Sequence, residues 1–139
     1  VLRIDKITVP EATTIRLGSY SLPKIEGKPF SIETCKQKPE ATIIGNGEYK
    51  LATVPLYGWD KTLVHYPTGV HPMSDQCSLI ISEKAVSGEH IVITLHLWKK
   101  GNKAFTKKEL SPIKSIKVAD DFSSVEATLT DGSIKIVKY

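Results

Sequence analysis

The sequence has no hydrophobic run long enough to cross a membrane as a helix. Such a helix needs roughly 18 or more consecutive apolar residues, and polar or charged residues interrupt every stretch of this chain earlier. Val1 opens directly into a strand-like pattern without a signal-peptide layout, and the chain does not begin with Met. We therefore expect no membrane span and interpret the chain as a mature form or a piece of a longer protein.

Arginine is also scarce. The net charge is +4, yet only Arg3 and Arg16 carry guanidinium groups, which suit bidentate contacts to bases and phosphates. The densest basic run, residues 99–108, includes Gly101 and Asn102 and is predicted to be a solvated loop. These features argue against a nucleic-acid partner. Dispersed lysines can still line a groove for an acidic polysaccharide, so that partner stays open.

The two cysteines, Cys35 and Cys77, lack the Cys-x-x-Cys spacing of a zinc or redox motif. Buried free thiols are the favoured interpretation, and a disulfide between them is left open. The chain also lacks a Gly-x-Ser-x-Gly elbow, a phosphate loop, a dinucleotide fingerprint and a His-Glu-x-x-His motif. These absences argue against hydrolase, kinase and dehydrogenase functions, and we expect no cofactor.

What the sequence does contain is a two-residue alternation of apolar and polar side chains. It is clearest from His90 to Trp98, where the odd positions are Ile91, Ile93, Leu95 and Leu97. A helix would scatter these residues around its surface, whereas a strand places them on one face. The segment is therefore predicted to be a half-buried β-strand.

A second strong signal lies at the C-terminus, where Val125–Thr130 and Ser133–Tyr139 flank the turn-forming pair Asp131-Gly132. Ala104–Leu110 is predicted to form at most one helical turn. Weaker strands are expected at Leu2–Val9, Thr14–Leu22, Phe30–Cys35, Ala41–Ile44, Tyr49–Leu56, Thr62–Tyr66, Ser78–Ser82 and Ser115–Ala119. The chain, residues 1–139, is thus predicted to be one all-β domain, an antiparallel β-sandwich of about ten strands.

The segment Pro67–Met73 is a restricted loop with titratable side chains around it. His65, His71 and Asp75 could ligate a metal, although their spacing matches no standard motif. Alternatively, His65 or His71 could act with Tyr66 as an acid/base pair on a sugar carbon. The simplest interpretation is that these residues brace the loop by hydrogen bonds.

Aromatic residues suggest contact with carbohydrate. Tyr57, Trp59 and Tyr66 lie close together in the sequence, and Trp98 falls on the more polar face of its strand. An exposed indole offers a flat apolar surface on which a pyranose ring can stack. The alternative is that these aromatics belong to the core, where sandwiches more often place them.

Two further histidines, His90 and His96, share a face of the same predicted strand. Six residues of strand separate them by about 20 Å at ~3.3 Å per residue. They therefore cannot ligate one metal, and each is expected to be a surface residue or a cross-strand partner.

Three segments together resemble the C-terminal β-sandwich of heparinase II/III-like polysaccharide lyases and related bacterial proteins: Val54–Trp59, His65–Asp75 and Gly88–Leu95. They cover about a third of the chain. The resemblance implies a secreted or periplasmic parent protein with an N-terminal α/α-toroid that acts on acidic glycans by β-elimination. Most catalytic residues of such enzymes lie in parts that this sequence does not contain, so no catalytic residue is assigned.

The functional hypothesis is therefore an accessory β-sandwich that packs on the catalytic domain of the same parent protein and is not active alone. Trp59, His65, Tyr66 and His71 would face the glycan cleft, with Trp98 as a further carbohydrate contact. The alternative is a stand-alone, non-enzymatic module for carbohydrate binding or for immunoglobulin-like adhesion.

Overall fold

The structure, a computed structural model, describes most of the chain. It covers the backbone of residues 1–21, 24–25, 28–29, 31–35, 41–45, 47–59, 61–65 and 78–139. Side chains are described at residues 1–14, 41, 43–45, 47–59 and 86–139. Within these residues no helix is long and apolar enough to cross a membrane.

Two long antiparallel strands form the spine of the fold. They are β1 (Leu2–Ser21) and β8 (Ser78–Lys100), and they pair along most of their length, from Leu2 opposite Leu95 to Ser21 opposite Ser78. Both strands are rich in β-branched residues, which favour the pleated conformation. β6 and β7 pair directly with β8, and β5 and β4 follow β6 outward.

The larger sheet has six strands in the described residues. Its order is β1-β8-β6-β5-β4, and β7 pairs with the first half of β8. A second sheet has three strands in the order β11-β10-β9, and β2 and β3 form a short ribbon. All pairings are antiparallel, so the predicted all-β sandwich is confirmed. The bounds are β2 Lys24–Ile25, β3 Lys28–Pro29, β4 Ser31–Cys35, β5 Ala41–Gly45, β6 Tyr49–Tyr57, β7 Lys61–His65, β9 Ile113–Val118, β10 Ser124–Leu129 and β11 Ile134–Lys138.

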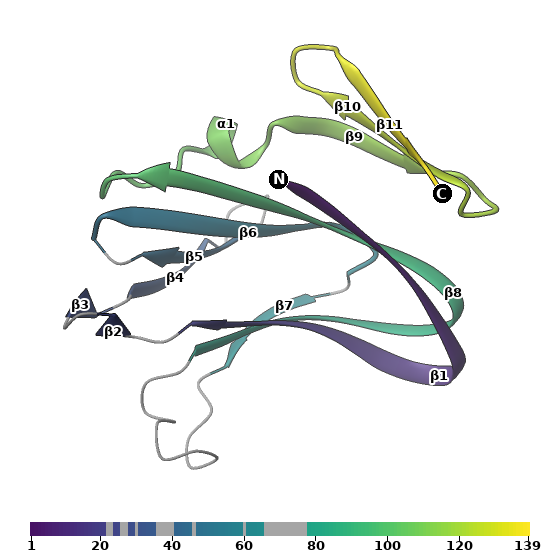
Figure 1. The fold of residues 1–139 in the computed structure, drawn as a ribbon, viewed down its shortest axis with the longest axis horizontal. Helices are drawn as coiled ribbons and strands as arrows, with labels where there is room; N and C mark the ends of the chain where they lie inside the picture. Colours follow the sequence, from purple (N-terminus) through teal and green to yellow (C-terminus); the bar gives the residue numbers. More distant parts are fainter. Residues whose placement is uncertain are drawn as a thin grey trace.

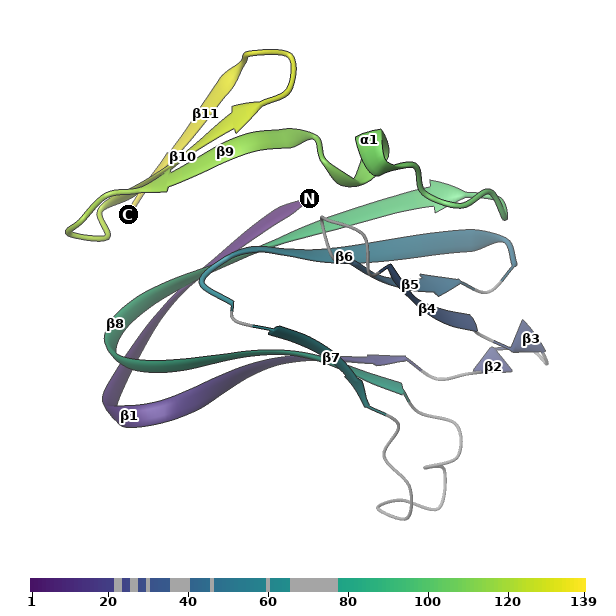
Figure 2. The ribbon, with the colours of Figure 1, turned by 180° about the vertical axis from the view of Figure 1, so that it is seen from behind.

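The larger sheet folds back on itself because its two longest strands bend together (Figure 1). The register between them shifts between Val9 and Thr13, where the intervening residues of β1 have no partner in β8. Such a bulge bends a strand and increases its twist. As a result, the half that contains β4, β5 and β6 lies between the three-stranded sheet and the half that contains β7, in both views (Figures 1 and 2).

The core lies between the middle layer and the three-stranded sheet. One cluster joins Val54 of β6 and Leu95 of β8 to Leu110, and the adjoining cluster joins Ile91 and Ile93 to Val125 of β10. The opposite face of β8 is buried as well, since Val92 and Thr94 are almost inaccessible to solvent. The prediction of a half-buried strand from His90 to Trp98 is therefore wrong at residues 91–95, which are covered on both faces.

A single helical turn, α1 (Lys107–Leu110), closes the edge of the first cluster. Thr106 and Glu109 form a capping box, in which the Glu109 N–H donates to Thr106 Oγ1 at 3.2 Å and the Thr106 N–H donates to Glu109 Oε2 at 2.6 Å. Lys99 Nζ on β8 donates to Glu109 Oε2 at 3.2 Å and lies 4.5 Å from the centre of the Phe105 ring. These contacts hold the turn against β8 with Leu110 buried.

The sequence located the strands better than it located their ends. Ser78–Ser82 and His90–Trp98 were expected to be separate but belong to the continuous β8, and Leu2–Val9 likewise merges in β1 with the described part of Thr14–Leu22. In the part of the chain that the structure describes, the two main sheets therefore hold fewer strands than the ten or so expected. The helical turn at the end of Ala104–Leu110 and the C-terminal hairpin are confirmed. The run 99–108 is a loop only in part, because it includes the end of β8 and the start of α1.

The position of Leu110 generates a test of the packing. Leu110→Ala should lower the free energy of unfolding by about 2–4 kcal/mol, because it leaves a cavity beneath α1 in the first core cluster. Lys108→Ala, in the same turn but exposed, is the matched control and should change it by less than about 0.5 kcal/mol. Urea unfolding of both variants measures the difference, and equal losses would contradict the packing described.

Candidate functional site

The most exposed tryptophan in the described residues is Trp98, near the end of β8. Its exposed fraction is 69%, in contrast to the buried Thr94 on the same face of the strand. Trp98 lies directly opposite Leu51 of β6, and the next pair on the same face of the two strands is Tyr49 opposite Lys100. We call these four residues the Trp98 surface. It combines two exposed aromatic rings and an exposed Leu with one ammonium group.

The inner end of the Trp98 surface is closed by His96. Its Nδ1 lies 3.4 Å from Oγ1 of Thr53, its cross-strand partner in β6. Burial of the ring, and secondly the positive charge of Arg3, lower the pKa of His96 below the ordinary value of 6.5. Because Thr53 is buried, its hydroxyl is not accessible as a nucleophile. The pair therefore offers a neutral hydrogen-bonding group beside an aromatic surface rather than a hydrolytic site.

Beside His96, Arg3 of β1 lies opposite Thr94 and forms an ion pair with Asp5, with Nε 2.8 Å from Oδ2. The Asp5 carboxylate partly offsets the effect of Arg3 on His96, since it favours the protonated imidazole. Burial nevertheless dominates, and the net shift of the His96 pKa is downward.

Trp59 lies in a different environment from Trp98. It follows Gly58, whose positive φ of 78° brings the chain close to the backbone of Ile91. The indole nitrogen of Trp59 is buried without a hydrogen-bond partner in the described residues. His90 Nε2 donates to the Gly58 carbonyl oxygen at 3.2 Å, so His90 lies near Trp59. Trp98 is eight residues beyond His90 on β8, about 26 Å away at ~3.3 Å per residue. The two tryptophans therefore do not form one surface.

The remaining predicted site residues are only partly covered by the structure. The backbone of His65 ends β7 and pairs with Leu79, but nothing is described of its side chain. Tyr66, His71 and Asp75 lie outside the described residues, so the metal and acid/base hypotheses stay predictions. Within the described residues there is no cluster of three metal-ligating side chains. Cys77 also lies outside the described part, and the question of a disulfide with Cys35 stays open.

The histidine prediction is supported where the structure describes it. His90 and His96 have separate neighbours, Gly58 and Thr53 respectively. The contribution of Tyr49 and Leu51 was missed. Both fall in a predicted strand, but their proximity to Trp98 depends on the register between β6 and β8, for which the sequence carries no local signal.

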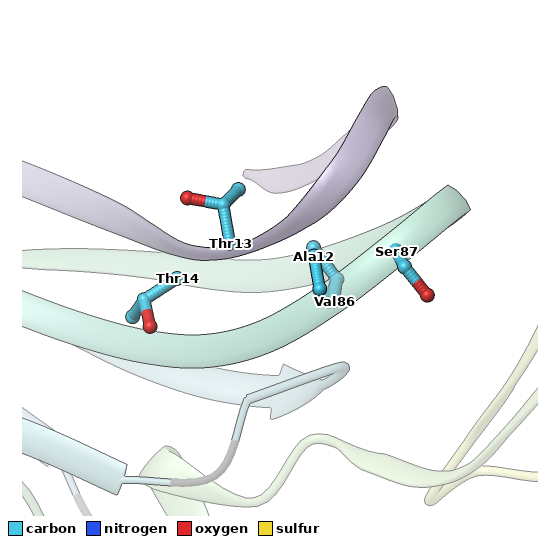
Figure 3. A pocket seen from close by; sticks show the side chains of 5 residues that line it. All are labelled: Ala12, Thr13, Thr14, Val86 and Ser87. Atoms are coloured by element: carbon cyan, nitrogen blue, oxygen red, sulfur yellow. The ribbon is translucent and has the colours of Figure 1, made fainter.

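A shallow cavity of about 390 Å³ lies at the bend of the long strands, lined by Ala12, Thr13, Thr14, Val86 and Ser87. Figure 3 shows that the three hydroxyl groups point in different directions rather than toward one point. A ligand site needs a few convergent polar groups. This cavity therefore gives no support to a binding site.

Comparisons of the chain with known protein families, with curated proteins and with solved structures find no match. The function is therefore inferred from the Trp98 surface and its neighbours.

The lowered pKa of His96 predicts a dependence of stability on pH. Below about pH 6.5 the unfolded chain takes up a proton at His96 that the folded chain resists, so the free energy of unfolding should fall as the pH decreases through the folded-state pKa. His96→Gln should reduce this slope. Urea unfolding of the wild type and the variant above and below pH 6.5 measures the slope. Both proteins contain the same carboxylates, so the difference between their slopes reports His96 alone. Identical slopes would show that burial of His96 does not control its protonation.

Gly58 generates a second prediction. A Cβ at this position would meet the Ile91 carbonyl oxygen and lie 3.0 Å from His90 Nε2, in addition to the strain of a positive φ. Gly58→Ala should therefore destabilise the fold by about 2–4 kcal/mol. Gly132→Ala is the matched control, because φ is 86° but the space around it is open. Gly132→Ala should lower the free energy of unfolding by about 1 kcal/mol. Calorimetric melting curves of the two variants measure the difference, and equal losses would contradict the close approach of Gly58 to Ile91.

Proposed function

We propose that this chain is a non-catalytic β-sandwich module that contacts carbohydrate through the Trp98 surface. The observation that carries the proposal is the 69% exposure of Trp98 at the end of a strand whose residues 91–95 are buried on both faces. A ligand that covers a large exposed indole displaces water from one face of the ring. A sugar ring presents a flat apolar C–H face that fits this face of the indole. Leu51 and Tyr49 extend the apolar area beside the indole.

Two further features support a binding role over a catalytic one. The groups beside Trp98 are suited to hydrogen bonding, namely the neutral His96 ring and the Lys100 ammonium group. The hydroxyl next to His96, that of Thr53, is buried, so it cannot serve at this surface as the nucleophile that acyl or glycosyl transfer would require. The resemblance to the C-terminal β-sandwich of heparinase II/III-like lyases supports an acidic polysaccharide as the ligand and a separate catalytic domain as the partner.

The accessory and the stand-alone roles share the same surface and differ in the partner. In the accessory role, the module belongs to a secreted or periplasmic polysaccharide-degrading protein, and the catalytic residues lie elsewhere. The isolated chain should then bind heparan sulfate, alginate or chondroitin sulfate without cleaving it. Formation of unsaturated products by this chain alone, followed by ultraviolet absorbance, would contradict both roles.

The binding role is tested by Trp98→Ala. This variant should weaken binding to the preferred polysaccharide by about tenfold or more, because it removes the stacking surface while leaving the buried part of β8 intact. Affinity electrophoresis against the three polysaccharides measures the change. Tyr139→Ala is the matched control, since Tyr139 is an exposed aromatic residue at the C-terminus, which lies away from the end of β8 in both views (Figures 1 and 2). Equal affinity of wild type and Trp98→Ala, or equal losses in both variants, would refute the proposal.

A further inference from the structure

The strand at the C-terminal edge, β11, exposes several large apolar side chains. The side chains of Ile134, Ile136, Val137 and Tyr139 are between 42% and 58% exposed. In the described residues β11 pairs only with β10, so its other edge is open. Open edges with apolar side chains are surfaces on which another strand can pair.

The hydrogen bonds to β10 determine which backbone groups face the open edge. The Tyr139 N–H donates to the Ser123 carbonyl at 2.9 Å, and the Leu129 N–H donates to the Ser133 carbonyl at 2.8 Å. In an antiparallel pair, residues alternate between bonding to the neighbour and pointing away from it. The odd-numbered residues of β11 therefore bond to β10. The N–H and C=O groups of Ile134, Ile136 and Lys138 point to the open edge.

We propose that β11 pairs with β11 of a second copy of this chain, in antiparallel orientation around a two-fold axis beside Ile136. In this register Ile136 faces its own counterpart, and Ile134 faces Lys138 of the second copy. All three positions have outward-pointing backbone groups, so they form three hydrogen-bonded pairs and join the two three-stranded sheets into one continuous sheet.

The side chains are compatible with the same register. Lys135 faces Val137 of the second copy, and Lys138 faces Ile134, so no lysine lies directly opposite another lysine. The aliphatic part of each lysine packs on an apolar neighbour while its ammonium group stays in water. The exposure of Val137 and Tyr139 shows that the larger sheet does not cover the inner side of β11, which leaves room for the second copy. Figures 1 and 2 show β11 on the outside of the fold.

The positive charge along the seam, the interface between β11 and β11 of the second copy, limits the strength of the pairing. Each copy brings Lys135 and Lys138 to the edge, and the whole chain carries a net charge of +4. The interface is also short. The dimer is therefore weak and forms only at high protein concentration. It strengthens when added salt screens the repulsion between lysines.

Sedimentation velocity over a series of concentrations tests the proposal with Ile136→Pro. Proline at this edge position removes an N–H that the fold does not use, so the variant should fold with an unchanged circular dichroism spectrum and melting temperature. It removes both central hydrogen bonds of the seam, one from each copy, and should weaken dimerisation by about tenfold or more. The wild-type dimer should become more abundant at higher salt.

Val137→Pro is the matched variant. The N–H of Val137 bonds to β10, so its loss should lower the melting temperature. A wild type that stays monomeric at about 1 mM would overturn the proposal. A dimer that persists in folded Ile136→Pro would place the interface elsewhere and also overturn it. If Ile136→Pro unfolds while Val137→Pro does not, the assigned backbone directions are wrong. None of these measurements involves carbohydrate, so they are independent of the Trp98 surface.

Discussion

The structure depends on the pairing of β1 with β8. β6 and β7 pair directly with β8, β5 and β4 follow β6 outward, and both core clusters include residues of β8. The central residues of β8 must therefore be apolar or fully satisfied on both faces. Thr94 is the exception, because its buried hydroxyl has no hydrogen-bond partner in the described residues. Its methyl group packs like that of valine, at the cost of desolvating the hydroxyl.

The change of environment along β8 links the fold to the proposed function. Residues 91–95 are buried between two layers, His96 is half-buried, and Trp98 is largely exposed. The rigid part of the strand thus presents the indole at a fixed position, which reduces the entropy lost when a ligand binds. The pairing proposed at β11 would place two such surfaces on one assembly. A polymeric glycan could contact both. Because the second contact would then be intramolecular, the overall affinity would exceed that of either surface alone.

The alternation of apolar and polar residues and the turn-forming residues made much of the fold predictable. The register between paired strands depends on contacts between distant segments, so it could not be predicted. The strand at His90–Trp98 and the hairpin around Asp131-Gly132 follow from local patterns. The continuity of β1 through Pro10 does not, because proline normally ends or weakens a strand and is tolerated here at a bulge without a ladder partner. For the site, exposure of Trp98 agrees with its place on the polar face. Burial of the Trp59 indole nitrogen depends on the close approach of Gly58 to Ile91, a contact between distant segments.

The distance in sequence between the two long strands has a consequence for biosynthesis. The backbones of Val1 and His96 are joined by hydrogen bonds although they are 95 residues apart. During translation the first strand therefore leaves the ribosome on the order of ten seconds before its partner is complete. Throughout that time its isoleucine and leucine side chains have no sheet to join, and the nascent chain is open to chaperones and to neighbouring chains.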